Sequence, residues 1–212
     1  MSYKRIDRNE IEEMDRVYRL NLMNSISGYK SANLIGTEEN GFSNLAIFSS
    51  VTHLGSNPPL LGMINRPNTV ERHSLDNLRK TGVYTINHIF EGITENAHYT
   101  SAKFDKAESE FDHCVIEKEY IGDFPAPFVK ESPVKLGMRL VEEIPIKSNG
   151  TILIVGEIEI AEIAERLITE SGQLDLNQGK VVAISGLNRY HQVAQIAHYP
   201  YARKEELPSF QR

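Results

Sequence analysis

Two segments rich in β-branched residues, joined by a turn sequence, constrain the fold of this chain more than any other feature. They cover residues 135–144 and 151–160, and Lys147-Ser148-Asn149-Gly150 lies between them. β-Branched residues favour strands, and an Asn-Gly step is the commonest centre of a tight hairpin turn. The sequence therefore predicts an antiparallel hairpin here.

Further strands are predicted on both sides of this hairpin. Glu39-Asn40-Gly41 supplies turn residues between a short strand at 32–36 and a strand that begins near Phe42. Pro58-Pro59 blocks a helix, so the apolar run that follows restarts as a strand. The predicted strands are 32–36, 44–51, 60–64, 83–89 and 181–184, in addition to the hairpin.

Helices are predicted at few places. Apolar residues recur at three- and four-residue spacing over residues 10–23, which predicts an N-terminal helix capped by Asn9. Residues 74–81 predict a short helix, with Ser74 as its cap and Gly82 just after its end. Residues 92–112 are expected to form short helices and loops, and the tail from about 186 to 212 is expected to be irregular.

This order of elements predicts a mainly β fold, with a single domain over residues 1–212. Six or more mostly antiparallel strands with few helices favour a closed or partly open barrel, because closure removes the exposed edges of a sheet. The length suffices for one substantial core.

Composition and local motifs exclude several function classes. The formal net charge of -6, with no run of basic residues, argues against nucleic-acid binding. No apolar run approaches the roughly 20 residues of a membrane span, and the charged N-terminus lacks the apolar core of a signal peptide, so a cytoplasmic protein is expected.

Metal and hydrolase chemistry find no support in the sequence either. The single cysteine, Cys114, excludes an internal disulfide and a thiolate metal cluster, and the seven histidines form no HxxxH or HExxH pattern. There is no GxSxG elbow, Walker loop or GxGxxG motif. No metal is expected, and no catalytic residue is assigned.

The segment from Asn44 to Asn87 favours a flat, phosphorylated ligand. Ser49 and Ser50 carry little bulk at the end of a predicted strand, so the backbone there can lie close to a ring system. The following turn gathers hydrogen-bond donors before a predicted helix, whose N-terminus favours an anion. Two alternatives remain open: the serines bond across the barrel, and the arginines are solvated surface residues. Asn87 reaches the ligand or closes a turn, with equal weight.

The motifs in this segment and beyond it resemble those of the flavin reductase-like family, the FMN-binding split barrels. The similar stretches occur in the family's order over residues 30–192. They are GFSNLAIFSSV from Gly41, Ser56-Asn57-Pro58-Pro59, Asn65-Arg66-Pro67, SLDN from Ser74, VYTIN from Val83, Gly156-Glu157-Ile158, and GLNRY from Gly186.

The resemblance implies a Greek-key split barrel that dimerises and holds one FMN per subunit near the dimer interface. It implies that the ring and ribityl chain contact Asn44, Ser49, Ser50 and Val51, and that the phosphate contacts Asn65, Arg66, Thr69, Arg72 and Ser74. Three roles are open for His191, His198 and the aromatic residues near them: to cover the flavin face, to contact a nicotinamide substrate, or to pack in a dimer.

The function implied is an FMN-dependent oxidoreductase, a flavin reductase that takes a hydride from NADH or NADPH. Since a flavin supplies its own hydride chemistry, the absence of a nucleophile-base pair agrees with this. The alternative is a flavin-binding electron carrier without nicotinamide turnover. An enzyme similar to pyridoxamine-phosphate oxidases is a third option, for which no separate substrate-phosphate motif is visible.

Overall fold

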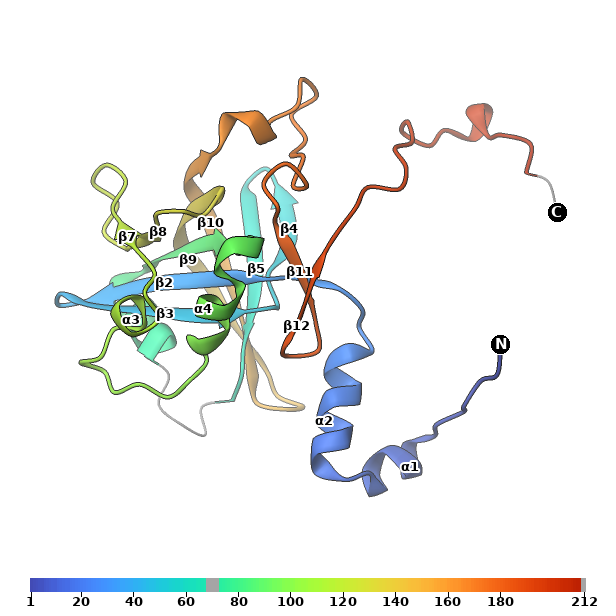
Figure 1. Cartoon of the computed structure of the whole chain (residues 1–212), viewed down its shortest axis with the longest axis horizontal. Helices are drawn as coiled ribbons and strands as arrows, with labels where there is room; N and C mark the ends of the chain where they lie inside the picture. Colours follow the sequence, from blue (N-terminus) through green and yellow to red (C-terminus); the bar gives the residue numbers. More distant parts are fainter. Residues whose placement is uncertain (68–72, 211–212) are drawn as a thin grey trace.

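The computed structural model describes residues 1–67 and 73–210, and its centre is one antiparallel sheet of seven strands that curls into a barrel (Figure 1). The strand order is β3-β2-β6-β9-β10-β5-β4. These strands are β2 (Asn33–Glu39), β3 (Phe42–Phe48), β4 (Thr52–Ser56), β5 (Pro59–Asn65), β6 (Val83–His88), β9 (Val134–Ile146) and β10 (Thr151–Ile163). The prediction of a mainly β barrel is confirmed.

Smaller elements surround the barrel. A three-stranded sheet has the order β1-β11-β12, and β7 pairs with β8. The strands are β1 (Lys30–Ser31), β11 (Val182–Ser185), β12 (Arg189–Gln192), β7 (Lys118–Glu119) and β8 (Phe128–Val129). The helices are α1 (Arg8–Glu13), α2 (Arg16–Ser25), α3 (His73–Thr81), α4 (Thr94–Tyr99) and α5 (Glu110–His113), with 3₁₀ turns η1 (Glu91–Ile93), η2 (Glu165–Leu167) and η3 (Lys204–Glu206). No helix in the described part of the chain is both long and apolar enough to cross a membrane.

The predicted hairpin of residues 135–144 and 151–160 is present as β9 and β10, which are longer than expected. Their pairing runs from Ile146 opposite Thr151 to Val134 opposite Ile163. Gly150 closes the turn with a φ of 73°, and its N–H donates to the Ile146 carbonyl at 2.9 Å. A positive φ is accessible to glycine at little cost, which explains why a glycine occupies position 150.

Strand β2 contributes to two separate cores. Leu34 packs in a cluster with Phe111 and other residues of the α4–α5 region, whereas the next residue, Ile35, packs inside the barrel with Tyr84. Leu34 and Ile35 are both 0% exposed. Because successive side chains point to opposite faces of a sheet, β2 is covered on both of its faces.

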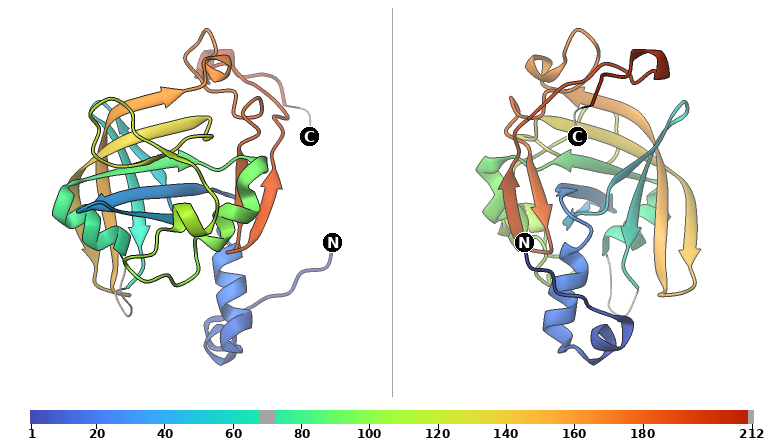
Figure 2. Two further views of the ribbon diagram at one scale, coloured as in Figure 1. Left: turned by 60° about the vertical axis from the view of Figure 1, so that its left-hand side comes forward. Right: turned by 90° about the vertical axis from the view of Figure 1, so that its right-hand side faces the viewer.

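The predicted N-terminal helix over residues 10–23 is wrong in its continuity and its cap. Two helices are present, and the first begins after Asp7, whose Oδ1 accepts the N–H of Glu10 at 2.9 Å. Asp15 then caps α2 by accepting the N–H of Val17 and of Tyr18. Local capping thus divides a continuous apolar pattern. Neither helix buries a residue, and both project from the barrel (Figure 2).

The tail after residue 186 is also more regular than expected. Residues 189–192 form β12, which pairs with β11 from Val182 opposite Gln192 to Ser185 opposite Arg189. Gly186, with a φ of 61°, starts the tight turn that makes this hairpin possible. From Val193 to Arg203 the chain has no regular structure, as predicted.

Gly156 on β10 yields a prediction about stability. A Cβ atom at this position collides with the hydroxyl of Tyr84, which is 0% exposed, and lies 3.2 Å from the Arg139 carbonyl. We expect Gly156→Ala to lower the free energy of unfolding by about 1–3 kcal/mol, because overpacking forces the buried ring to move. Urea denaturation measures the change. The exposed Ala161→Ser on the same strand is the control and should change stability by less than about 0.5 kcal/mol.

Candidate functional site

The residues predicted to hold a cofactor meet where β3, β5 and the start of α3 come together. Asn44 on β3 is 7% exposed, and its amide Nδ2 donates to the hydroxyl of Ser74 at 2.8 Å. Ser74 is the second residue of α3, one residue inside the expected cap position. This bond joins two predicted residues that lie far apart in the sequence.

The hydroxyl of Ser50 is occupied by the neighbouring strand. Its Oγ accepts the N–H of Ile64 at 3.0 Å and donates to the carbonyl of Ile64 at 3.2 Å. This is the cross-barrel bonding held open as an alternative for the serine pair. What Ser50 offers a ligand is therefore mainly small size and backbone groups, because its hydroxyl already donates to and accepts from Ile64.

Ser49, Val51 and Asn65 lie beside Ser50. Ser49 and Val51 are half-buried, and the carbonyl of Val51 accepts the hydroxyl of Ser31 at 3.2 Å. Asn65 ends β5, is 3% exposed, and its Nδ2 donates to the carbonyl of Arg66 at 2.8 Å. Asn65 thereby fixes the backbone from which the Arg66 side chain starts.

A pair of cations marks this end of the site. Burial lowers the pKa of Lys30, and the positive charge of the nearby Arg66 lowers it further. Within residues 1–67 and 73–210, neither Lys30 nor Arg66 forms an ion pair with a carboxylate. An anion relieves the repulsion between two like charges, so this is a favourable place for a phosphate.

Lys30 was not predicted from the sequence. It is half-buried, and its Nζ donates to the carbonyls of Asn24 at 3.0 Å and Gly186 at 3.3 Å. A single lysine before a short strand carries no motif, and its neighbour Arg66 is distant in the sequence. Only the folded chain reveals the pair.

Two predicted phosphate residues, Thr69 and Arg72, lie outside the described residues. His73, the first residue of α3, has its Nε2 3.3 Å from the carbonyl of Phe104. Within the described part of the chain, no group of three or more histidine, cysteine or acidic side chains is placed to hold a metal ion.

Comparison with known proteins identifies the fold family. The family model for the flavin reductase like domain matches residues 30–185, which include all seven barrel strands. This chain belongs to the flavin reductase-like family. The match begins at β1 and ends at β11, so α1, α2 and β12 lie outside it.

Solved structures agree with this family. A candidate flavin reductase with a split barrel domain from Shewanella frigidimarina NCIMB 400 is 45% identical, with a TM-score of 0.91 over 94% of this chain and 100% of that one. Component B of nitrilotriacetate monooxygenase from Bacillus cereus has a TM-score of 0.81 at 19% identity, covering 94% and 100% of the two chains. An FMN-binding protein from Thermus thermophilus has a TM-score of 0.69 at 17% identity, covering 82% and 91%. The split-barrel prediction is confirmed.

The residues present fit FMN, the cofactor of this family. The cations Lys30 and Arg66 and the hydroxyl of Ser74 suit its phosphate, and the amide of Asn44 suits the polar ribityl chain. The small residues after β3 leave space for the ring system. Each part of the cofactor thus has a chemically matched part of the site.

Proposed function

We propose that this flavin reductase-like protein binds FMN at the junction of β3, β5 and α3 and works as an NAD(P)H-dependent flavin reductase. The observation that carries the proposal is the Lys30–Arg66 cation pair beside the Asn44–Ser74 bond, in a chain with the family's fold. The relative at 45% identity, described as a candidate flavin reductase, supports the activity.

The protein's own residues bind and orient in this proposal. Arg66, Asn65, Ser74 and the newly found Lys30 hold the phosphate, together with the predicted Thr69 and Arg72. Asn44 holds the ribityl chain, and Ser49, Ser50 and Val51 line the ring with small side chains and backbone. FMN held by these residues would supply the redox chemistry, which is hydride uptake from NADH or NADPH and electron delivery to free flavin, oxygen or a partner protein.

We also propose that residues 1–212 form one domain and that the chain is a homodimer. The single domain is supported by β11, which pairs with β1 near the start of the family match and with β12 after its end. The dimer is implied by the resemblance. It is supported by α2, which buries no residue and exposes the apolar side chains of Val17 and Leu20. The cytoplasm is the compartment proposed, from the sequence alone.

The first prediction tests the activity directly. The purified protein is mixed with FMN, freed of excess, and titrated with NADH and with NADPH in the absence of oxygen. We expect the visible absorption of bound flavin to bleach with at least one nucleotide, because hydride transfer reduces the ring.

Bovine serum albumin treated with FMN in the same way is the control for flavin carried over without a site. Bound flavin that stays oxidised with both nucleotides rejects the reductase and favours the electron carrier. Protein that retains no flavin rejects the cofactor assignment.

A further inference from the structure

Glu110, the first residue of α5, carries a buried carboxylate. It is 6% exposed, and no other acidic residue in the described part of the chain is buried. Within that part it forms no ion pair. Burial raises the pKa of this carboxyl, and the N–H of Leu45 and the nearby His73 and His113 lower it in part. Burying a carboxylate without an ion pair is costly, and hydrogen bonds must offset that cost.

The carboxylate of Glu110 binds the edge of the barrel sheet. Its Oε2 accepts the N–H of Leu45 on β3 at 2.8 Å. Because β3 is an edge strand, an N–H on its outer side needs an acceptor from elsewhere in the fold. Glu110 supplies that acceptor, and a charged acceptor gives a stronger bond than a neutral one.

A second bond between the start of α5 and β3 lies beside the first. The Oγ atoms of Ser109 and Ser43 are 3.0 Å apart. Ser109 and Glu110 are consecutive, and their partners Ser43 and Leu45 are the two neighbours of Asn44 in the sequence. The start of α5 therefore fixes the backbone of β3 on both sides of Asn44.

The helix α3, which carries Ser74, is contacted by the same region of the chain. The Nε2 of His73 lies 3.3 Å from the carbonyl of Phe104. The ring of Phe104 in turn stacks on that of His113 in α5, with centroids 5.1 Å apart. Residues 104–113 thus contact both elements that supply the polar part of the proposed FMN site.

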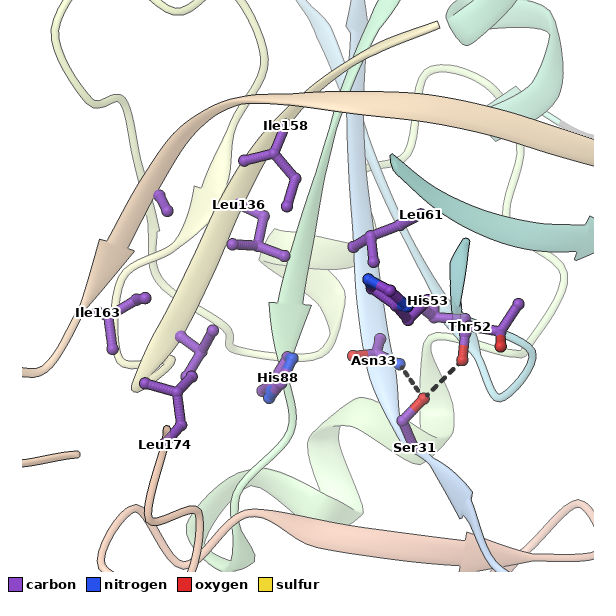
Figure 3. A pocket seen from close by; sticks show the side chains of 13 residues that line it. Ser31, Asn33, Thr52, His53, Leu61, His88, Leu136, Ile158, Ile163 and Leu174 are labelled. Carbon is purple, nitrogen blue, oxygen red and sulfur yellow. Dashed lines mark hydrogen bonds between the residues drawn. The ribbon is translucent and has the colours of Figure 1, made fainter. Parts of the chain in front are cut away.

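These contacts lie outside the apolar part of that site. A cavity of about 360 Å³ beside Val51 offers space for the flavin ring, and Leu61 and Leu136 line it (Figure 3). None of the described residues of α5 lines this cavity. Glu110 therefore acts on a bound flavin through the residues that it holds in place.

We propose that Glu110 is a positioning residue for flavin binding, which fixes β3 through the N–H of Leu45 and so holds the amide of Asn44 toward the ribityl chain. Ser109 assists through its bond to Ser43. The inference rests on the proposed FMN site and adds the support behind it. Binding groups need such support because a small shift of the strand loses the hydrogen bond to the ligand.

Two substitutions and two probes test this role. Glu110→Gln keeps an oxygen acceptor for the N–H of Leu45, whereas Glu110→Leu has a similar size and no acceptor. Riboflavin and lumiflavin share the isoalloxazine ring, but only riboflavin carries the ribityl chain. Equilibrium dialysis measures the dissociation constants of both flavins.

We expect Glu110→Leu to weaken riboflavin binding about fivefold and to change lumiflavin binding less than about twofold, because one neutral hydrogen bond is lost. Glu110→Gln should restore the riboflavin affinity. Asn96→Ala is the matched control, since it removes a bond from the Asn96 amide to the Cys114 carbonyl in the same region, and that bond does not involve β3. It should leave both affinities unchanged.

A double-mutant cycle tests whether Glu110 acts through Asn44. In the Asn44→Ala protein the ribityl contact is already absent, so adding Glu110→Leu should cause no further loss of riboflavin affinity. If Glu110→Leu fails to fold, Ser109→Ala takes its place in the cycle. The Ser109 side chain makes no cap bond in α5, so this change removes only the bond to Ser43 and should weaken riboflavin binding about threefold.

Several results overturn the proposal. Equal losses of riboflavin and lumiflavin affinity show that Glu110 supports the ring cavity or the whole fold, and a full further loss in the Asn44→Ala protein shows a route that bypasses Asn44. A loss in Glu110→Gln as large as in Glu110→Leu rejects the hydrogen bond as the cause. Unchanged riboflavin affinity in Glu110→Leu, or in Ser109→Ala where that variant replaces it, rejects the positioning role and leaves the FMN site standing. If the unmodified protein binds neither flavin, the proposed function itself is wrong, and this inference with it.

Discussion

Removing the positive charge of Arg66 is expected to lower the affinity for FMN about tenfold, and removing that of Lys30 as well to lower it about a hundredfold. Arg66→Ala deletes one cation, and Lys30→Gln keeps hydrogen-bond donors for the two backbone carbonyls that Lys30 holds. Each charged hydrogen bond to a phosphate contributes roughly 1.5–3 kcal/mol. Quenching of FMN fluorescence during titration measures the dissociation constants.

Riboflavin is the decisive control because it lacks only the phosphate. Its affinity should be the same for the unmodified protein and for both variants. Arg203→Ala, which removes an exposed arginine from the tail, should affect neither ligand. Equal losses of FMN and riboflavin affinity would show that the cations act on the fold or on the ring, and not on the phosphate.

Acidification is expected to destabilise the protein through His88. Burial lowers the pKa of this ring from 6.5 to about 4 in the folded state. Between these values the unfolded chain binds more protons than the folded one, so the free energy of unfolding falls as the pH falls from 6.5 to 4. The loss saturates below pH 4 at no more than about 3 kcal/mol, since His88 is half-buried as a whole.

The contribution of His88 is isolated by comparing variants, because carboxylates titrate in the same range. In urea denaturation, the free energy of unfolding of the unmodified protein minus that of His88→Asn should fall as the pH is lowered from 7 to 4, by no more than about 3 kcal/mol. The exposed His53→Asn serves as the matched control. Parallel curves for His88→Asn and the unmodified protein would contradict the prediction.

Strands and turns were predictable because their signals are local. The Asn40-Gly41 step predicts a turn with two left-handed residues, and the φ angles found are 53° and 82°. Gly82, expected just after the helix at 74–81, has a φ of 75°, and its N–H bonds to Leu78 as a helix end requires. Such features depend on neighbouring residues alone, so the sequence suffices for them.

The N-terminal helix pair shows where local signals compete. The apolar periodicity of residues 10–23 favoured one helix, but the carboxylate of Asp15 accepts two backbone N–H groups and starts a second. Because neither helix buries a side chain, no tertiary packing enforces continuity across Met14. The cap therefore decides the structure.

The polar residues that matter most were hidden from sequence analysis for a different reason. Lys30 meets the carbonyl of Gly186 across 156 positions of the chain, and Glu110 meets the N–H of Leu45 across 65. Glu110 lies in the polar segment 92–112, where a carboxylate is expected at the surface and not in a buried position. Their neighbours come from the barrel's topology, which local patterns do not encode.

The double coverage of β2 has a consequence for how this protein loses its structure. A strand that packs on both faces cannot leave one core without exposing the other. The core on the α4–α5 side and the core inside the barrel should therefore unfold together. The amide hydrogens of β2 should exchange with solvent only when the whole molecule opens. The protein therefore has two cores, and the seven residues of β2 join them into a single cooperative folding unit.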